Sequence, residues 1–429
     1  MPVNQLLNKL QKYQLSRDTV VPKSAYLHIP FCRRRCYYCD FPVSVVGNKT
    51  GENSGTIQQY IDVLSQEISI TPKLGYPLET IFFGGGTPSL LSVEQLKHLL
   101  DVLNKQFGIA ANAEISMEID PGTFNYQQIK GYLDVGVNRI SMGVQAFQDE
   151  LLQICGRSHN VSDIYASVEI IRAAAVPNFS IDLISGLPHQ TLAQWQASLE
   201  KAVAIAPNHI SIYDLIIESV TAFGRQYQPG DKPLPTDETA ANMYRLAQQV
   251  LTSKGYQHYE ISNYSQPGYQ CRHNRVYWEN QPYYAFGMGA SSYVDGCRFT
   301  RPRKTREYYE WVQQLTKNNG IFECPQISEN EVLLETLMLG LRMAEGLSLQ
   351  TLAEQFGTQT IKQIWTCLQP YYKQGWVEVL DRNCGLTKLG EIRYNNQLPT
   401  AGRIRLSDPE GFLFSNTILA TLFSELGED

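Results

Sequence analysis

The 429-residue sequence has no apolar run that approaches the ~20 residues needed to cross a bilayer, so it predicts no membrane span. It also lacks a strong excess of either charge. The net charge of −6 is mild and argues against broad electrostatic binding to nucleic acid. Residues 1–23 are polar, and their pattern is too weak to indicate a targeting peptide. Nine cysteines without a secretory signal are typical of a reducing compartment, and we expect a cytoplasmic protein.

The strongest local signal is a three-cysteine loop, Cys32-x3-Cys36-x2-Cys39, which follows a short apolar stretch at residues 24–29. No second Cys or His pair with metal-ligand spacing follows, so a closed zinc site lacks its fourth ligand. Three thiolates on a [4Fe–4S] cube instead leave one iron open to an exogenous ligand. The cysteine spacing therefore favours an iron–sulfur cluster. A zinc site, or a chance spacing without a metal, remains the alternative. The arginines at residues 33–35 would favour thiolates, or they form a solvated basic loop.

Strand-like and helix-like stretches alternate along the first part of the chain. The expected strands are residues 24–29, 80–83, 114–119, 138–143, 179–184 and 209–214. Helical patterns cover residues 56–70, 92–107, 126–135, 161–175, 192–206 and 237–255. This order indicates βαβ units and a parallel sheet. Six units fall short of the eight of a closed barrel, so the sequence predicts an α/β fold with a partial (β/α)6 barrel.

Polar residues and glycines fall at or near the carboxyl ends of these strands, where parallel α/β folds bind ligands. Gly84, Gly85 and Gly86 follow the second strand, where the missing Cβ atoms let backbone groups approach a ligand closely. The other positions are Glu118, Gln145, Asp182 and Tyr213. Each of them alone has an ordinary structural explanation. Their expected convergence on one rim predicts a binding site.

The cysteine loop and five later blocks resemble the radical S-adenosylmethionine (SAM) superfamily, and within it the coproporphyrinogen-dehydrogenase-like branch. The blocks are residues 83–89, 116–123, 139–147, 156–157 and 181–188. The resemblance runs from about Tyr26 to the C-terminus. It implies that Cys32, Cys36 and Cys39 hold a [4Fe–4S] cluster. It also implies that SAM contacts Tyr26, Gly85, Gly86, Thr87, Glu118, Gln145, Arg157 and Asp182.

Two functions compete within this branch. One is the oxygen-independent coproporphyrinogen III oxidase of porphyrin biosynthesis, which decarboxylates two propionates by radical chemistry. The other is a heme chaperone of the HemW type, which hands heme to acceptor hemoproteins. The oxidase has a longer N-terminal extension and a fourth Cys where this chain has Phe41. The chaperones show a His-Asn-x-x-Tyr-Trp signature, present here at residues 273–278. The resemblance therefore implies a heme chaperone, with the oxidase as the alternative and a radical SAM enzyme for another substrate as the third reading.

His273 is the candidate heme-binding residue of this signature, because a neutral imidazole is a good axial ligand for heme iron. Tyr277 and Trp278 can stack on a flat macrocycle. Alternatively, the His-Asn pair caps a turn and the aromatic pair fills the core, and Cys271 is a rival ligand. The other cysteines have no paired spacing and are expected to be small core residues: Cys155, Cys297, Cys324, Cys367 and Cys384.

The sequence predicts four regions: a tail at 1–23, the partial barrel at 24–256, a covering segment at 257–326 and a C-terminal domain at 327–429. The covering segment contains an Asp295-Gly296 hairpin turn. Ser328 and Glu331 form a capping box, and residues 376–387 resemble the wing of a winged-helix domain. From residue 331 onward, eight Lys/Arg face twelve Asp/Glu, which argues against a nucleic-acid partner. The expected partners are heme, unidentified acceptor hemoproteins and, if SAM is cleaved, an electron donor; a homodimer stays open.

Overall fold

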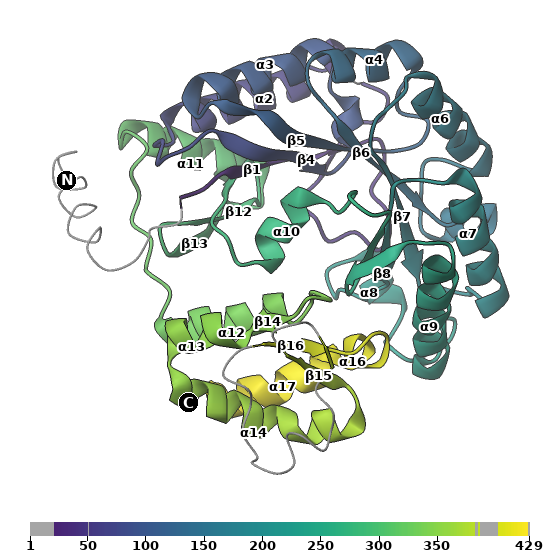
Figure 1. The fold of residues 1–429 in the computed structure, drawn as a ribbon. Coiled ribbons are helices and arrows are strands. Elements are labelled where there is room, and N and C mark those ends of the chain that lie inside the picture. The colour runs from purple at the N-terminus through teal and green to yellow at the C-terminus, as the bar shows by residue number, and fades with distance from the viewer. Residues whose placement is uncertain (1–20, 50, 382–384, 387–401, 428–429) are drawn as a thin grey trace.

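The computed structural model describes residues 21–49, 51–381, 385–386 and 402–427. In these residues a nine-stranded sheet runs in the order β11-β1-β4-β5-β6-β7-β8-β10-β9, with helices along its outer face (Figure 1). The central strands pair in parallel: β1 (Ser24–Ile29), β4 (Leu78–Gly85), β5 (Ile109–Ile119), β6 (Arg139–Gln145), β7 (Phe179–Ser185) and β8 (His209–Asp214). The predicted partial (β/α)6 barrel is therefore confirmed. β5 begins earlier than its predicted start at Glu114.

Helices connect these strands across the outer face of the sheet. They are α2 (Gly55–Ile70), α3 (Val93–Gln106), α4 (Tyr126–Asp134), α5 (Asp149–Ile154), α6 (Val161–Ala173), α7 (Leu192–Ile205), α8 (Ala222–Gln226) and α9 (Asp237–Ser253). Reciprocal capping boxes begin α3, α6 and α7, so backbone N–H groups at these helix starts are satisfied locally. The chain thus reverses direction at defined residues between strand and helix.

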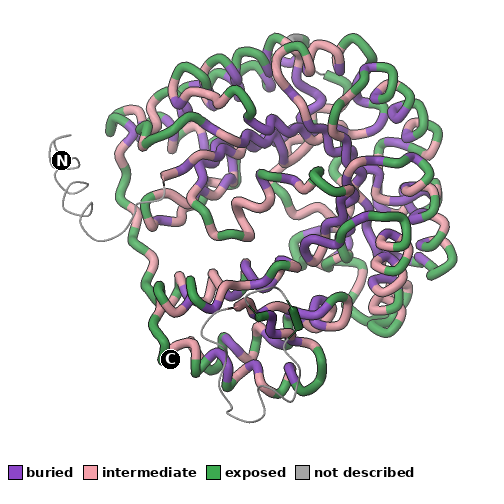
Figure 2. The backbone as a smooth tube through the Cα atoms, viewed as in Figure 1, coloured by how far each residue is buried: buried purple, intermediate pink, exposed green. Residues whose placement is uncertain are grey.

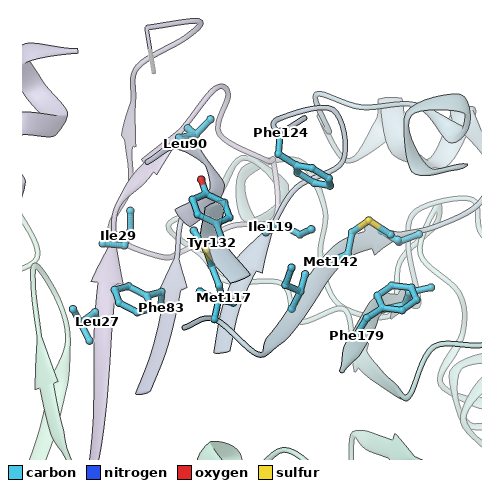
Figure 3. Packing of buried hydrophobic residues seen from close by; sticks show 14 of the residues in the cluster. Leu27, Ile29, Phe83, Leu90, Met117, Ile119, Phe124, Tyr132, Met142 and Phe179 are labelled. Atoms are coloured by element: carbon cyan, nitrogen blue, oxygen red, sulfur yellow. The ribbon is translucent and has the colours of Figure 1, made fainter. Parts of the chain in front are cut away.

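Side chains of the parallel strands alternate between the helices and the barrel lumen. The helix-facing residues form one apolar core, part of which is seen in Figure 3, where Leu27 and Ile29 lie near Phe83. Figure 2 shows burial concentrated along the sheet. The opposite set of side chains is largely polar: Tyr26, Glu118, Ser141, Asp182, Ser211 and Tyr213. The same alternation therefore produces an apolar wall and a polar lumen.

Further strands extend both edges of the sheet. β9 (Gln257–Glu260) and β10 (Asn263–Ser265) add antiparallel strands beside β8, and β11 (Tyr284–Phe286) adds a parallel strand beside β1. Within the described residues β9 and β11 do not pair, so the sheet stays open. Helix α10 (Arg272–Trp278) lies in this opening (Figure 1). The cysteine loop adds a small parallel pair, β2 (Phe31–Cys32) and β3 (Ser44–Val45).

The predicted Asp295-Gly296 hairpin is confirmed. It joins β12 (Ser291–Val294) to β13 (Cys297–Thr300), and both turn residues have positive φ. Cys297 is buried as predicted, but a disulfide that the spacing did not indicate joins it to Cys324. Their separation of 27 residues gave no signal, since β13 meets the chain before α12 only in the folded structure. Cys155 is buried as predicted, Cys367 is half-buried, and Cys384 lies outside the described residues.

The C-terminal part has its own apolar core. After α11 (Thr305–Lys317) it contains α12 (Glu329–Gly340), α13 (Leu349–Phe356), α14 (Thr358–Gln374), α16 (Glu410–Leu413) and α17 (Ser415–Leu426). Its antiparallel sheet runs β14 (Leu347–Ser348), β16 (Arg403–Leu406), β15 (Val377–Leu380). The predicted capping box at Ser328 is confirmed. In the wing, β15 pairs with β16, and its last residue Leu380 also forms an antiparallel bridge with Leu386, as the hairpin prediction expects. Residues 382–384 and 387 lie outside the described residues. None of the described helices is both long and apolar enough to cross a membrane.

One buried ion pair ties the covering segment to the barrel. Glu67 of α2 is completely buried, and its Oε1 accepts a hydrogen bond from Arg301 Nε at 2.7 Å. Its Oε2 accepts the Tyr308 hydroxyl at 2.6 Å and the Gly287 N–H at 2.9 Å. One carboxylate of the barrel therefore holds three positions between residues 287 and 308.

Substituting Arg301 with Met should lower the free energy of unfolding by about 3–5 kcal/mol, because it leaves the Glu67 carboxylate buried without its cation. Arg306→Met is the matched control, since Arg306 pairs with Glu310 on an exposed face and its loss should leave stability nearly unchanged. Urea unfolding of both variants checks this. Equal stability of the Arg301 variant and wild type would contradict the structural role of this pair.

Candidate functional site

The barrel lumen contains a cavity of about 240 Å³. Every central strand contributes to its wall, together with the cysteine loop and α10. The lining residues are Tyr26, Phe41, Phe82, Gly85, Glu118, Arg139, Ser141, Asp182, Ser211, Tyr213, Asn274 and Tyr277. Of the predicted SAM contacts, the structure brings Tyr26, Gly85, Glu118 and Asp182 together at this cavity. The others lie beside the cysteine loop or support it.

The glycine run at the end of β4 packs against the start of the cysteine loop. The N–H of Gly86 donates to the carbonyl of Ile29 at 2.8 Å, and the N–H of Thr87 donates to the carbonyl of Phe31 at 2.7 Å. A Cβ on Gly86 would lie 2.7 Å from the Phe31 carbonyl oxygen. A side chain at this position would therefore displace the backbone next to Cys32.

Side-chain donors reach two of the cysteine sulfurs. Arg157 Nη1 donates to Cys36 Sγ at 3.4 Å, and Thr87 Oγ1 donates to Cys32 Sγ at 3.8 Å. Asp120 joins these two donors, because its carboxylate accepts Arg157 Nη2 at 2.5 Å and Thr87 Oγ1 at 3.2 Å. Donors of this kind stabilise anionic sulfur and tune iron–sulfur clusters.

Gln145 lies in the same neighbourhood. A Cβ on Gly143 would come within 3.0 Å of Gln145 Nε2, 2.9 Å of Asp120 Oδ1 and 3.2 Å of Arg157 Nη2, so these side chains surround one glycine. Gln145 has φ 67, an unusual backbone conformation for a residue with a side chain. Strained residues of this kind cluster at functional sites. The predicted residues Thr87, Gln145 and Arg157 thus form an outer group beside the cysteines.

The three cysteines are half-buried free thiols. Among the described residues, no three His, Cys, Asp or Glu side chains could hold a single metal ion. A [4Fe–4S] cube spreads three thiolates over three different iron atoms, so it does not require convergence on one point. The spacing of the three thiols, and the hydrogen bonds that Cys32 and Cys36 accept, therefore fit a [4Fe–4S] cluster better than a zinc ion.

The arginines between the first two cysteines do not prevent burial from raising the pKa of the Cys32 thiol. Arg33 donates to the Gly122 carbonyl at 2.8 Å, and Arg35 donates to the Cys39 carbonyl at 3.1 Å. Burial, with a smaller contribution from the charge of Asp120, raises the pKa of the Cys32 thiol to about 12. Binding of a metal centre would therefore have to displace the thiol protons.

Two of the predicted residues that line the cavity, Glu118 and Asp182, are acids whose pKa values are raised by burial. Glu118 Oε2 accepts the Gly85 N–H at 2.9 Å. Burial, together with the negative charge of Asp182, raises the pKa of Glu118 to about 8. Asp182 accepts the Ser141 hydroxyl at 3.0 Å, and burial raises its pKa as well. At neutral pH the Glu118 side chain is therefore mostly a neutral acid that can donate as well as accept hydrogen bonds.

Helix α10, which carries the His-Asn-x-x-Tyr-Trp signature, forms one wall of the cavity. The buried Glu114 carboxylate fixes its start by accepting the backbone N–H groups of Arg272 and His273, each at 3.0 Å. Asn274 and Tyr277 then face the cavity. Trp278 lies against the guanidinium of Arg342, 4.4 Å from the ring centroid, in the turn after α12. The signature thus connects the lumen to the C-terminal part.

His273 does not reach the cavity wall. It is fully buried, with Nδ1 2.8 Å from Thr80 Oγ1 and Nε2 2.8 Å from the Tyr277 hydroxyl. Burial and the nearby charge of Arg139 lower the pKa of this imidazole to about 3, so it is neutral. Both ring nitrogens already have partners, and the rival ligand Cys271 is buried with its Sγ 3.6 Å from Glu114 Oε1. In this conformation neither side chain presents a free ligand atom to the cavity.

Sequence reasoning missed several residues of this region, including the cavity-lining Phe82, Ser141 and Ser211. Two charged residues among those missed are Asp120 and Arg139. Asp120 immediately follows β5, so the rule that points to strand ends could have included it. Arg139 begins β6 and therefore lies at the opposite end of a strand from the predicted rim. Only its position on the lumen-facing side of β6 brings its long side chain to the cavity.

The open parallel barrel with a three-cysteine loop at its carboxyl rim defines a radical SAM protein, and residues 26–202 match the Radical SAM superfamily. Residues 327–390 match the HemN C-terminal domain. The chain is 45% identical to the heme chaperone HemW of Synechocystis sp. over 96% of its own length and 98% of that protein. It is 35% identical to the heme chaperone HemW of Bacillus subtilis, covering 87% and 97% of the two chains. The chain therefore belongs to the HemW family within the radical SAM superfamily.

A solved structure shows the same fold. Coproporphyrinogen III oxidase (HemN) from Escherichia coli, a radical SAM enzyme, superposes with a TM-score of 0.77, covering 96% of this chain and 92% of the oxidase. The sequence identity is 22%, so this likeness concerns the fold alone.

Replacing Gly86 with Ala should reduce the iron bound after anaerobic reconstitution and lower the free energy of unfolding by about 1–3 kcal/mol, because the new Cβ overlaps the backbone of the cysteine loop. Gly55→Ala is the matched control, since a Cβ there meets no atom within 4 Å. Iron analysis and thermal unfolding of both variants check this. Unchanged iron content in the Gly86 variant would contradict the proposed contact.

Glu118→Gln should alter how stability depends on pH. The pKa of Glu118 is about 8 in the folded protein and 4.5 as the ordinary value, so the folded state holds this proton more tightly. The stabilisation is complete below pH 4.5 and is lost as the pH rises through 8. The melting temperature of the wild type should therefore fall relative to the Gln variant as the pH rises from 4.5 to 8, and the difference should stay constant above that. Parallel curves in differential scanning calorimetry would show that Glu118 does not titrate in this way.

Proposed function

We propose that this chain is a heme chaperone that binds a [4Fe–4S] cluster and SAM and transfers heme to acceptor hemoproteins. The observation that carries the proposal is the position of the His-Asn-x-x-Tyr-Trp helix, whose Asn274 and Tyr277 line the same cavity as Tyr26 and Glu118. The full-length similarity to proteins named heme chaperone HemW supports the same conclusion. We further propose that the protein acts in the cytoplasm.

In this proposal Cys32, Cys36 and Cys39 ligate the cluster, whose open iron site chelates SAM. SAM is then bound next to the cluster by the outer group (Thr87, Gln145 and Arg157) together with Gly86. Arg157 already has its guanidinium between Cys36 and Asp120, where it can meet anionic oxygen of a ligand. At the cavity wall, Tyr26, Glu118 and Asp182 supply hydroxyl and carboxyl groups, and Gly85 supplies backbone.

The aromatic side chains at the cavity favour a flat apolar ligand. Phe41 of the cysteine loop and Tyr213 of β8 both line the cavity and are 55% and 46% exposed. Phe82 and Tyr277 continue this aromatic surface inward. Aromatic rings contribute large contact areas to a planar macrocycle. We propose that heme docks against these rings.

Anaerobically reconstituted protein should bind hemin saturably, and it should release heme when an apo-hemoprotein is added. The same preparation should not convert coproporphyrinogen III to protoporphyrinogen. Absorbance titration in the Soret region measures binding and transfer, and product analysis measures turnover. Turnover to protoporphyrinogen would contradict the chaperone function and support the oxidase.

We propose that His273 contributes to heme binding by positioning Tyr277. Because Nε2 of His273 contacts the Tyr277 hydroxyl, His273→Ala and Tyr277→Phe should both weaken hemin binding, by roughly threefold to tenfold. The Soret and EPR spectra of the bound heme should stay unchanged.

His209→Ala is the matched control, because His209 is equally buried and hydrogen-bonded to Ser180 and Tyr259 but does not line the cavity. It should leave hemin affinity close to that of the wild type. A changed heme spectrum in His273→Ala alone would instead identify His273 as an iron ligand.

A further inference from the structure

Arg139 is a buried cation in which two of the three guanidinium nitrogens are unpaired. Its side chain is among the largest fully buried ones, at 1% exposure. Nε and Nη1 have no hydrogen-bond partner among the described residues. A guanidinium carries five N–H donors, and leaving them unsatisfied in a dry interior is costly. Arg139 also lines the lumen cavity, so a molecule in the cavity can satisfy it.

The nearby acids are already occupied by other donors. Glu114 accepts the N–H groups of Arg272 and His273. Asp182 accepts the Ser141 hydroxyl at both oxygens, at 3.0 and 3.1 Å. The raised pKa of Glu118, about 8, leaves that side chain mostly neutral at pH 7. Glu114 and Asp182 thus act on Arg139 through their charge, while the hydrogen bonds of their carboxylates named above go to other donors.

We propose that Arg139 binds a carboxylate of the ligand that enters the lumen cavity, an assignment that rests on the proposed function for the identity of that ligand. Guanidinium and carboxylate match as planar, bidentate hydrogen-bonding partners. The two candidate sources are a propionate of heme and the amino-acid carboxylate of SAM.

The aromatic mouth of the cavity favours the propionate, while its volume requires that only part of the ligand enters. Complete sites for drug-sized ligands measure about 300–1,000 Å³. A cavity of about 240 Å³ therefore admits one arm of a larger molecule. Exposed Phe41 and Tyr213 lie where the apolar body of such a molecule would stay, while Arg139 lies at the start of β6, away from the rim. A porphyrin with propionate arms has this distribution of apolar surface and charge.

Two ligand pairs test the assignment on reconstituted wild-type protein. Hemin is compared with hemin dimethyl ester, and SAM is compared with decarboxylated SAM, each by equilibrium titration. If the propionate binds Arg139, the ester should bind about 10- to 100-fold more weakly than hemin. The alternative outcome is that the wild type binds SAM more tightly than decarboxylated SAM but binds hemin and its ester equally. If Arg139→Met then loses the preference for SAM, the SAM carboxylate binds Arg139 and the propionate assignment is overturned.

Substitutions then identify the residue responsible. Arg139→Met should bind hemin about 10- to 100-fold more weakly and should no longer distinguish hemin from its ester. Arg139→Lys keeps the cation and should retain part of the discrimination. Arg306→Met, on an exposed helix face, should behave as wild type.

Several outcomes would overturn the proposal. Equal binding of acid and ester forms in both ligand pairs by the wild type would do so without any variant, even if Arg139→Met failed to fold. Retained discrimination in a folded Arg139→Met protein would do so as well. Absence of saturable hemin binding in the wild type would contradict the proposed function and the propionate assignment together, whereas equal binding of hemin and its ester contradicts only the latter.

Discussion

The structure depends on close backbone contact between the cysteine loop and the glycine run at the end of β4. Hydrogen bonds from Gly86 and Thr87 to the carbonyls of Ile29 and Phe31 hold the start of the loop against the barrel rim. This contact requires glycine, because a Cβ on Gly86 would overlap the backbone at Phe31. It brings Cys32 within hydrogen-bond reach of Thr87 and Cys36 within reach of Arg157, so the cysteine loop has a defined position on the barrel. The position of any cluster relative to the lumen follows from this docking.

The lumen below the loop has two levels. The rim has the acids and hydroxyls expected where parallel strands end, and Glu118 and Gly85 are joined by a hydrogen bond there. The deeper level is built by Glu114, which anchors α10, and by Arg139 at the start of β6. His273 belongs to this deeper level, as a buried connector between Thr80 and Tyr277. The signature helix therefore closes the open side of the barrel while exposing only selected side chains to the cavity.

The sequence predicted the barrel well, because buried parallel strands are short apolar runs bounded by turn residues; β1 and β8 were located without error. It also located Glu118 and Asp182, since strand ends are visible in the pattern. Depth along the lumen is not visible in that pattern, so Arg139 was missed and the fully buried His273 was interpreted as a candidate heme ligand. The Cys297–Cys324 disulfide was missed for a related reason, because it joins segments that meet only after folding. Local periodicity specifies elements and their ends, whereas these features depend on tertiary packing.

The central claim is that three cysteines hold an iron–sulfur cube whose fourth iron is open to SAM. Mössbauer spectroscopy of protein reconstituted with ⁵⁷Fe, recorded with and without SAM, tests it most directly. The account predicts a [4Fe–4S] spectrum in which one iron site changes when SAM is added. A zinc-loaded or metal-free protein, or a cluster whose iron sites all ignore SAM, would contradict it.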